Sequence, residues 1–389
     1  MRLLFVSEVY PPRAGGAGWS TRALARGLRA AGPDVAVLTT SPGPDDLDGL
    51  RVQRLHAEGR KRLAVPRAFA RHLDDRPHDV VHAQHSLSAL GALAGADVDR
   101  TVVTVRDHWP VCFWSTRISQ GRLCPGCGIQ AMTRCVKGHV PGPPQLAWGA
   151  IPYMLGDLRE KQRALQRAGA TLAVSEAIAA ELREARIPRV QVIPNVVDAE
   201  ETRALARDEP SFALPESFLL FVGKLEENKG ARLLVSAVAA AGTGLPLVIL
   251  GEGTLTHEVK REAALREVSL VHRGWASRED VLRAMARATA VVFPSLWPEP
   301  LSRVLLEGLA VGAPLAAMAT GGTAEIVEDG ASGLLVKEAD AAALGDAIRR
   351  LVLDDTLRRH LSEGARARAE HFAPERLVPR YEAVYRGLA

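Results

Sequence analysis

Two glutamates, Glu299 and Glu307, stand eight residues apart in the stretch PSLWPEPLSRVLLEGLAVGAPLAAMATGG. If a helix begins near Leu301 or Ser302, Glu307 lies on its second turn and Glu299 lies in the loop before it. The backbone amides of Leu301, Ser302 and Arg303 would then be donors at the positive end of a helix, which suits an anion. The stretch therefore predicts a phosphate site with a carboxylate on either side to hold hydroxyl groups.

All four cysteines of the chain fall within 24 residues, in the spacing Cys-x11-Cys-x2-Cys-x7-Cys: Cys112, Cys124, Cys127 and Cys135. A Cys-Pro-Gly-Cys knuckle with two further thiols is typical of a closed tetrahedral zinc site. His139 is an alternative ligand in place of Cys112, and an iron–sulfur cluster or free or paired thiols are the alternatives to zinc. We expect a structural zinc that makes this insertion rigid and takes no part in the chemistry.

Short apolar runs alternate with amphipathic helical stretches along nearly the whole chain. Such runs are typical of strands in parallel sheets that are covered on both faces. In the first half they are residues 3–8, 34–40, 79–84, 101–107, 171–176 and 190–195; in the second half they are residues 217–225, 246–253, 268–274, 290–295, 313–318 and 332–336. The rhythm predicts an α/β protein with βαβ units, right-handed crossovers and doubly wound parallel sheets.

A polar link near residues 198–216 divides this rhythm into two Rossmann-like domains. We expect an N-terminal domain of residues 1–200, which carries the cysteine-rich insertion of residues 112–139, and a C-terminal domain of residues 215–372. The last helix, residues 373–389, is expected to pack back on the first domain. The carboxyl ends of both sheets are expected to face a cleft, since open α/β sheets bind ligands there.

The composition argues against several function classes. The net charge is +4 and the arginines are spread over many helices, while aromatic residues make up only 5% of the chain, so nucleic-acid binding is not supported. A basic site for a phosphorylated small molecule fits this charge. No uninterrupted apolar run reaches about 18 residues, and the N-terminal run is too short for a secretory signal, so we expect a cytoplasmic protein.

One helical stretch, residues 145–167, begins with aromatic and apolar residues that include Trp148, Ile151 and Tyr153 and ends with basic ones. Two interpretations are open. It is either an interface helix for a lipid-linked acceptor or the inner membrane surface, or a buried helix between the domains. The oligomeric state is not predicted.

An ordered series of motifs resembles the retaining GT-B glycosyltransferases of family 4, group 1. The motifs are PPRAGGAG, DVVHAQ, VIPNVVD, FVGKLEENKG, ILGEG, the Glu-x7-Glu stretch above and EIVEDGASGLLV, and together they cover nearly the full chain. A Glu-x7-Glu spacing alone is weak, because acidic helices show it by chance, but within this series it is specific. The resemblance implies two Rossmann-like domains and the transfer of a hexose from a nucleotide diphosphate sugar.

The resemblance also implies roles for single residues. Glu307 would accept hydrogen bonds from the ribose of a uridine or guanosine nucleotide, and Glu299 would contact the donor sugar. Lys224 and Lys229 would hold the diphosphate in place of a metal ion, because a leaving nucleoside diphosphate needs fixed cations. The remaining substrate contacts fall on loop glycines, on the ends of strands and on the start of the Glu307 helix: Gly15, Gly16, Asn195, Gly223, Gly251, Leu301 and Ser302.

This chain departs from the family pattern at the end of TVVTV, where the family often has His-Asp. Here Arg106 occupies the histidine position and is followed by Asp107 and His108. Either Arg106 takes over a polar contact to substrate, or His108 turns inward. We keep Asp107 and His108 among the catalytic candidates. The family also usually has arginine where this chain has Lys224, which exchanges a forked contact for a point charge.

These observations predict an enzyme that transfers a hexose to a hydroxyl acceptor with retention and needs no metal ion at the reaction centre. No nucleophile is evident, so the leaving phosphate itself would take the proton of the acceptor. The alternative of another class is a catalytically silent sugar- or nucleotide-binding scaffold of the same fold. A fold does not decide between them by itself.

Overall fold

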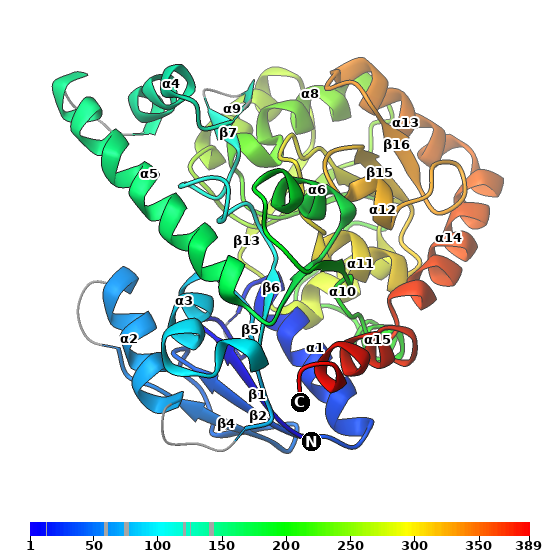
Figure 1. The fold of residues 1–389 in the computed structure, drawn as a ribbon. Coiled ribbons are helices and arrows are strands. Elements are labelled where there is room, and N and C mark those ends of the chain that lie inside the picture. The colour runs from blue at the N-terminus through cyan, green and yellow to red at the C-terminus, as the bar shows by residue number, and fades with distance from the viewer. Residues whose placement is uncertain (13, 58–60, 74–77, 120–121, 125, 140–143) are drawn as a thin grey trace. The chain divides into compact units, whose positions relative to one another are not determined.

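The computed structural model describes residues 1–12, 14–57, 61–73, 78–119, 122–124, 126–139 and 144–389. The chain forms two compact units. In Figure 1 the first is coloured blue to green, with the red helix at the C-terminus, and the second is coloured green to orange-red. Unit 1 comprises Met1–Val196 together with Pro374–Ala389, and unit 2 comprises Val197–Ala373. The polar segment around residues 198–216 belongs to unit 2, where it contributes α7 (Ala199–Leu205).

The main sheet of unit 1 has, within the described residues, eight strands in the order β10-β9-β6-β5-β1-β2-β4-β3. All neighbours pair in parallel except β3, which runs antiparallel to β4. The chain leaves β1 toward β2 and later returns to β5 on its other side, so the topological switch point lies between β1 and β5. The strands are β1 (Arg2–Ser7), β2 (Asp34–Thr39), β3 (Asp46–Leu47), β4 (Leu50–Arg54), β5 (Val80–Ala83), β6 (Thr101–Val105), β9 (Ala170–Ala173) and β10 (Val190–Val192).

The helices of unit 1 include one from the C-terminus of the chain. They are α1 (Gly16–Ala30), α2 (Lys61–Leu73), α3 (Ser86–Gly95), α4 (Ile129–His139), α5 (Pro144–Arg167), α6 (Glu176–Glu184) and α15 (Pro374–Arg386), with a 3₁₀ turn at Val98–Arg100. Helix α15 lies along α1 (Figure 1), and a Cβ on Gly27 would stand only 2.9 Å from Val378. The glycine therefore permits the close contact that holds the C-terminal helix on unit 1.

Unit 2 repeats the plan with six parallel strands, counted over its described residues, in the order β13-β12-β11-β14-β15-β16. The strands are β11 (Leu219–Val222), β12 (Leu247–Leu250), β13 (Leu270–Gly274), β14 (Ala290–Phe293), β15 (Leu315–Met318) and β16 (Leu334–Val336). The helices are α7, α8 (Ala231–Ala241), α9 (Thr256–Leu265), α10 (Arg278–Arg287), α11 (Arg303–Val311), α12 (Thr323–Ile326), α13 (Ala341–Leu353) and α14 (Asp355–Ala369), with 3₁₀ turns at Glu227–Lys229 and Glu370–Phe372. Its switch point lies between β11 and β14.

These sheets confirm the predicted α/β class and the two Rossmann-like sheets. Strands β5, β6, β9, β11, β12, β14 and β15 are apolar and almost fully buried, as both-face coverage requires. The short strand β4 was not predicted, because its sequence LRVQR alternates buried and open positions and lacks a continuous apolar run.

The insertion between β6 and β9 holds the small antiparallel pair β7 (Ile118–Ser119) and β8 (Arg122–Leu123), followed by α4 and α5. Helix α5 is not a buried helix: Trp148 and Tyr153 are about 60% exposed, whereas Ile151 and Met154 pack in a small core with α4. One face of α5 is therefore open, while the other packs against α4.

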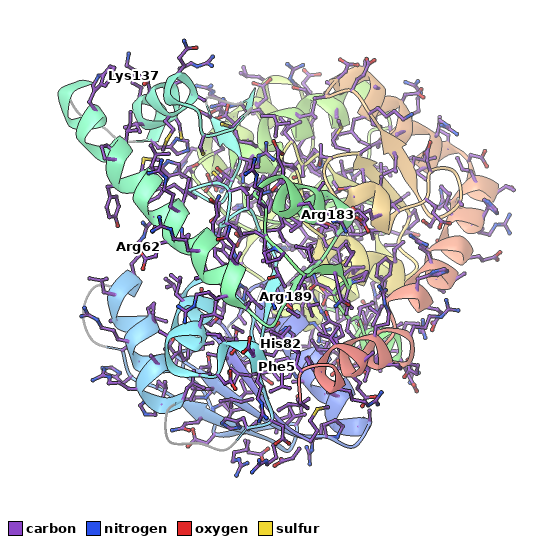
Figure 2. The ribbon with its side chains drawn as sticks, in the orientation of Figure 1. Phe5, Arg62, His82, Lys137, Arg183 and Arg189 are labelled. Atoms are coloured by element: carbon purple, nitrogen blue, oxygen red, sulfur yellow. The ribbon has the colours of Figure 1, made fainter. Side chains whose placement is uncertain are left out.

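Two histidines at the carboxyl end of β5 are buried within unit 1. Figure 2 shows His82 beside Phe5, and their ring centroids are 5.0 Å apart. The His82 ring lies 2.8 Å from the Tyr385 hydroxyl of α15 and 2.7 Å from Oγ1 of Thr104. Burial, and then the charge of Arg106, lowers the pKa of His82 well below its usual value and that of His85 to about 3.

We expect unit 1 to lose stability as the pH falls below about 6.5. A histidine whose pKa is depressed by folding contributes stability that is present above the pKa of the unfolded chain, because below it only the unfolded chain takes up the proton. Each histidine should lower the free energy of unfolding by about 1.4 kcal/mol per pH unit, down to its folded pKa.

Urea unfolding at several pH values between 7 and 5 measures this slope, and His82→Leu provides the comparison. The variant should show a slope smaller by about 1.4 kcal/mol per pH unit. An unchanged slope would show that His82 is not held neutral in the folded protein.

Candidate active site

The carboxyl end of the unit 2 sheet holds Glu299, in the loop between β14 and α11. Its side chain is 3% exposed. Its Oε1 accepts hydrogen bonds from Nζ of Lys229 at 2.5 Å and from the hydroxyl of Ser295 at 2.7 Å. Its carbonyl oxygen accepts from the amide of Gly322 at 2.6 Å. Backbone and side chain are thus both fixed beside the switch point, where an open α/β sheet binds its ligand.

Lys229 reaches Glu299 because two loops pack against each other. The carbonyl of Asn228 accepts the amide of Trp297 at 2.8 Å, and the Lys229 ammonium lies 4.1 Å from the centroid of the Trp297 ring. The next residue, Gly230, has φ +71°, and a Cβ there would stand 1.9 Å from the carbonyl oxygen of Pro294. Only glycine fits this approach, so the turn that carries Lys229 depends on Gly230.

Neither Ser295 nor Trp297 was among the predicted site residues. Both lie in the segment PSLWPEP, from which the prediction used only the carboxylate of Glu299. A polar and an aromatic residue within four positions of a candidate sugar-binding carboxylate would have been the signal.

Lys224 and the two predicted glycines stand at the ends of β11 and β12. Lys224 is exposed, unlike the half-buried Lys229. Gly223 and Gly251 have φ +149° and +142°, and a Cβ on Gly251 would stand 2.0 Å from the carbonyl oxygen of Gly223. Close packing against Gly223 therefore requires glycine at position 251, whether or not this residue also makes the predicted substrate contact.

Glu307 lies on the second turn of α11, and its carboxylate is held by two arginines. The helix begins at Arg303 with Ser302 as its N-cap, and Leu301, Ser302 and Glu307 are all buried. Oε1 of Glu307 accepts from Nε of Arg278 at 2.9 Å and from Nε of Arg303 at 3.0 Å. Burial lowers the pKa of the Arg303 guanidinium, while the Glu307 carboxylate opposes that effect. Glu307, the candidate for hydroxyl binding, thus also belongs to a buried cluster of charges with Arg278 and Arg303.

The carboxyl end of the unit 1 sheet holds Arg106 after β6. The residue is 8% exposed, and its guanidinium donates to Oε1 of Gln84 and Oδ1 of Asn195. The predicted residues Arg106 and Asn195 are therefore in direct contact, although 89 positions separate them. Gln84 was not predicted, but it is the residue after the strand in DVVHAQ.

His108 takes a different direction from Arg106. Its Nδ1 lies 2.7 Å from Oε2 of Glu181 on α6, and the side chain is 2% exposed. Burial alone would raise the pKa of Glu181, but hydrogen bonds from His108 and Arg117 outweigh it and lower the pKa. Burial raises the pKa of Asp107, whose Oδ1 accepts the amide of Trp109 at 2.8 Å. At this edge Arg106 and His108 are thus held by separate partners.

The glycine loop after β1 leads into α1. Gly15 is the N-cap of α1, and Gly16 is its first residue. A Cβ on Gly15 would meet nothing within 4 Å, whereas one on Gly18 would stand 2.6 Å from Cβ of Ala14. Packing therefore explains Gly18, while Gly15 leaves open space at the start of the helix, where an anion is favoured.

The four cysteines are all free thiols within the insertion. Burial, and after it the neighbouring thiols Cys112 and Cys124, raises the pKa of Cys127 and of Cys135 to about 11. Over the described residues, no three His, Cys, Asp or Glu side chains form a group that is already spaced to hold a metal ion. In the same part of the chain, no helix combines the length and the apolar character needed to pass through a bilayer.

The sequence matches two protein families that together span nearly the whole chain. Residues 14–201 match the family described as "Glycosyltransferase Family 4", and residues 202–368 match "Glycosyl transferases group 1". The boundary between the two matches falls close to the boundary between the two structural units.

Relatives and solved structures agree with these matches. A glycogen synthase of Mycobacterium tuberculosis is 29% identical, over 95% of this chain and 90% of its own length. A D-inositol 3-phosphate glycosyltransferase of Nocardioides sp. is 28% identical, over 96% and 85% respectively. Sucrose-phosphate synthase from Thermosynechococcus elongatus shares the fold with a TM-score of 0.72 and 23% identity, over 100% of this chain and 98% of that one. Anabaena HepE, solved with UDP-glucose, has a TM-score of 0.73 at 18% identity, over the full length of both chains.

The two Rossmann-like sheets and these structural neighbours define the GT-B fold. The chain belongs to the group 1 glycosyltransferases of family 4, a nucleotide-sugar-dependent class of enzymes. None of the comparisons supports a catalytically silent scaffold.

Proposed function

We propose that this chain is a retaining hexosyltransferase. It moves a hexose from a uridine or guanosine diphosphate sugar to a hydroxyl acceptor and needs no metal ion at the reaction centre. The observation that carries the proposal is the contact of Lys229 with the buried carboxylate of Glu299 at the carboxyl end of the unit 2 sheet. The HepE structures, which were solved in complex with UDP and with UDP-glucose, support the same class of donor.

The donor side of the reaction belongs to unit 2. As the bond from the anomeric carbon to the phosphate oxygen breaks, negative charge grows on the leaving diphosphate, and the ammonium groups of Lys229 and Lys224 stabilise it. Glu299 holds a hydroxyl of the donor sugar, and Glu307 accepts hydrogen bonds from the ribose. The amides of Leu301 and Ser302 precede α11, whose N-terminus favours an anion.

The acceptor side belongs to unit 1. The acceptor oxygen forms its bond to the anomeric carbon on the face that the phosphate leaves, and its proton passes to the departing diphosphate. Arg106, Asn195, Asp107 and His108 stand at the carboxyl edge of the unit 1 sheet and would orient the acceptor. The enzyme would act in the cytoplasm, and the exposed Trp148 and Tyr153 of α5 suit an acceptor that is lipid-linked or close to a membrane surface.

A test of this proposal uses donor binding and metal dependence together. A nucleotide that binds only the folded chain should stabilise it by about 2.7 kcal/mol at 100 times its dissociation constant, which raises the melting temperature. Among UDP, GDP and their sugars, we expect one base to give this shift in a buffer without divalent cations. The same nucleotide sugar should be hydrolysed slowly when no acceptor is present.

Addition of Mg²⁺ or Mn²⁺ should change the hydrolysis rate by less than about twofold, because lysines take the role that a metal ion has in other transferases. Nucleotide binding that appears only with a divalent cation would refute the proposed role of the lysines. A shift with none of the nucleotides would refute the donor assignment.

A further inference from the structure

The four cysteines lie in a subdomain of unit 1 that has little apolar core of its own. Among the residues that the structure describes here, the insertion core has five buried members, Phe113, Met132, Val136, Ile151 and Met154, and both Cys127 and Cys135 pack against it. A core of this size buries too little apolar surface to hold a fold, and small substructures of this kind usually need a covalent or metal crosslink. No disulfide supplies one, since all four thiols are free.

Backbone contacts bring the first three cysteines to one place. Sγ of Cys112 lies 3.4 Å from the amide nitrogen of Arg117, which donates to it. The antiparallel pairing of β7 with β8 places Cys124 beside Arg117, and the amide of Cys124 donates to the Arg117 carbonyl at 2.7 Å. Sγ of Cys127 donates to the carbonyl of Val111, the neighbour of Cys112, at 3.4 Å. These contacts tie the segments that carry Cys112, Cys124 and Cys127 to one another.

The fourth cysteine comes from α4, which packs against the same loop. Cys135 Sγ lies 3.8 Å from Nδ1 of His139, one turn further along the helix. The His139 ring stacks on the Trp114 ring, with centroids 4.8 Å apart and an angle of 11° between the planes. Trp114 follows Cys112 by two positions, so this stack joins the loop of Cys112 to the helix of Cys135.

We propose that Cys112, Cys124, Cys127 and Cys135 bind one structural zinc ion as a closed four-thiolate site. The turn of the Cys-x-x-Cys knuckle suits this role, because Gly126 takes a φ of +132° that other residues avoid. The described side chains do not form a ready-made metal group, so the thiols must draw in to about 2.3 Å from the ion as it binds. The zinc assignment itself does not depend on the donor or acceptor proposed above; only its expected effect on KM for the acceptor rests on the proposed function.

The zinc site would affect the enzyme by fixing the position of the loop that carries His108. Arg117 donates to Oε1 of Glu181 at 2.5 Å and to the carbonyl of Cys124 at 3.2 Å. Glu181 also holds His108, whose carbonyl accepts the amide of Cys112 at 2.8 Å. The zinc would thus hold the loop that carries His108 against α6, and it would act as a support without touching substrate.

The experiment is a metal analysis of the full-length chain, purified without a histidine tag. We expect about one zinc and no iron per chain, and X-ray absorption should show four sulfur neighbours at about 2.3 Å. Cys124→Ser and Cys127→Ser should lose the zinc and lower the melting temperature. Gln130→Ala, an exposed change on α4 outside the site, should keep the zinc.

In the cysteine variants that fold, the affinity for the nucleotide should stay within about twofold, because unit 2 folds around its own core, whereas KM for the acceptor should rise. Less than about half an equivalent of zinc in the wild-type chain would overturn the proposal. Iron in its place, or a nitrogen neighbour from His139, would overturn the four-thiolate zinc assignment even if both cysteine variants failed to fold.

Discussion

Alanine in place of Lys229 is expected to lower kcat/KM for the donor by about 100- to 1,000-fold, which is the usual cost of removing one preorganised group that stabilises a charged transition state. Lys229 is held 2.5 Å from Glu299 and lies over the ring of Trp297, so its ammonium is oriented before substrate binds. A group that is already in place needs no reorganisation as charge develops on the diphosphate. Steady-state kinetics with a nucleotide sugar and its acceptor measure the effect.

Three variants separate this effect from a change in folding. Lys229→Met keeps an apolar stem over Trp297 and should lose as much activity as alanine while melting close to wild type. Lys224→Ala should cost less, because Lys224 is exposed and the more solvated cation contributes less. Lys260→Ala removes an exposed lysine on α9 and should leave activity unchanged. Turnover near the wild-type value in Lys229→Met would remove this lysine from the site.

Glu299→Ala should also lose most of the activity, and the loss should not add to that of Lys229→Ala. The two side chains share one hydrogen bond, and residues that act as a unit give non-additive effects. The double variant should therefore be about as slow as the slower single variant. Fully additive losses would indicate that the two residues act independently.

Alanine in place of Glu307 is expected to destabilise unit 2 by about 3–5 kcal/mol, because it leaves two buried guanidinium groups without their shared carboxylate. Side-chain exposures of Arg278, Arg303 and Glu307 are only 7–8%, so water cannot replace the lost partner. Urea unfolding, followed by a probe of unit 2, measures this loss. It should exceed the effect of any exposed ion pair in the chain.

The matched control is Glu262→Ala, which breaks the exposed pair with Arg266 on α9. Side-chain exposures there are 31% and 45%, so we expect a loss of no more than about 0.5 kcal/mol. Replacement of the whole cluster by apolar residues, Arg278→Met with Arg303→Met and Glu307→Leu, should restore stability but not nucleotide binding. If Glu307→Ala costs no more than the control, the carboxylate is not needed by the two arginines.

Local sequence patterns predicted much of this fold. Each of the six apolar runs predicted in either half contains a strand, because a parallel strand buried on both faces must be continuously apolar. The pattern failed at β4, whose residues alternate. It left two interpretations open for α5, because an exposed aromatic face does not differ in composition from a buried one. Aromatic content alone does not show whether a second element covers a helix.

The candidate site also contains residues that were predicted and residues that were missed. The positions of Glu299 and Glu307 after a strand could be predicted from one short motif, whereas Lys229 was implied by the resemblance to a family, and the roles of all three stay predictions. Ser295, Trp297 and Arg278 were missed, because their contacts depend on how one loop or helix packs on another. Gly18 was missed for the same reason, since the close approach that requires it involves Ala14 and is set by the turn of the loop.

The amino-acid sequence by itself determined the order of strands and helices, the ends of the sheets where chemistry can occur, and the carboxylates placed there, because side-chain periodicity and turn chemistry act over a few residues. Tertiary structure alone decided the partners of those carboxylates. Lys229 meets Glu299 across 70 positions, and Arg278 meets Glu307 across 29. Contacts of this kind arise only when βαβ crossovers bring separate loops to the same edge of a sheet, and no local pattern records them.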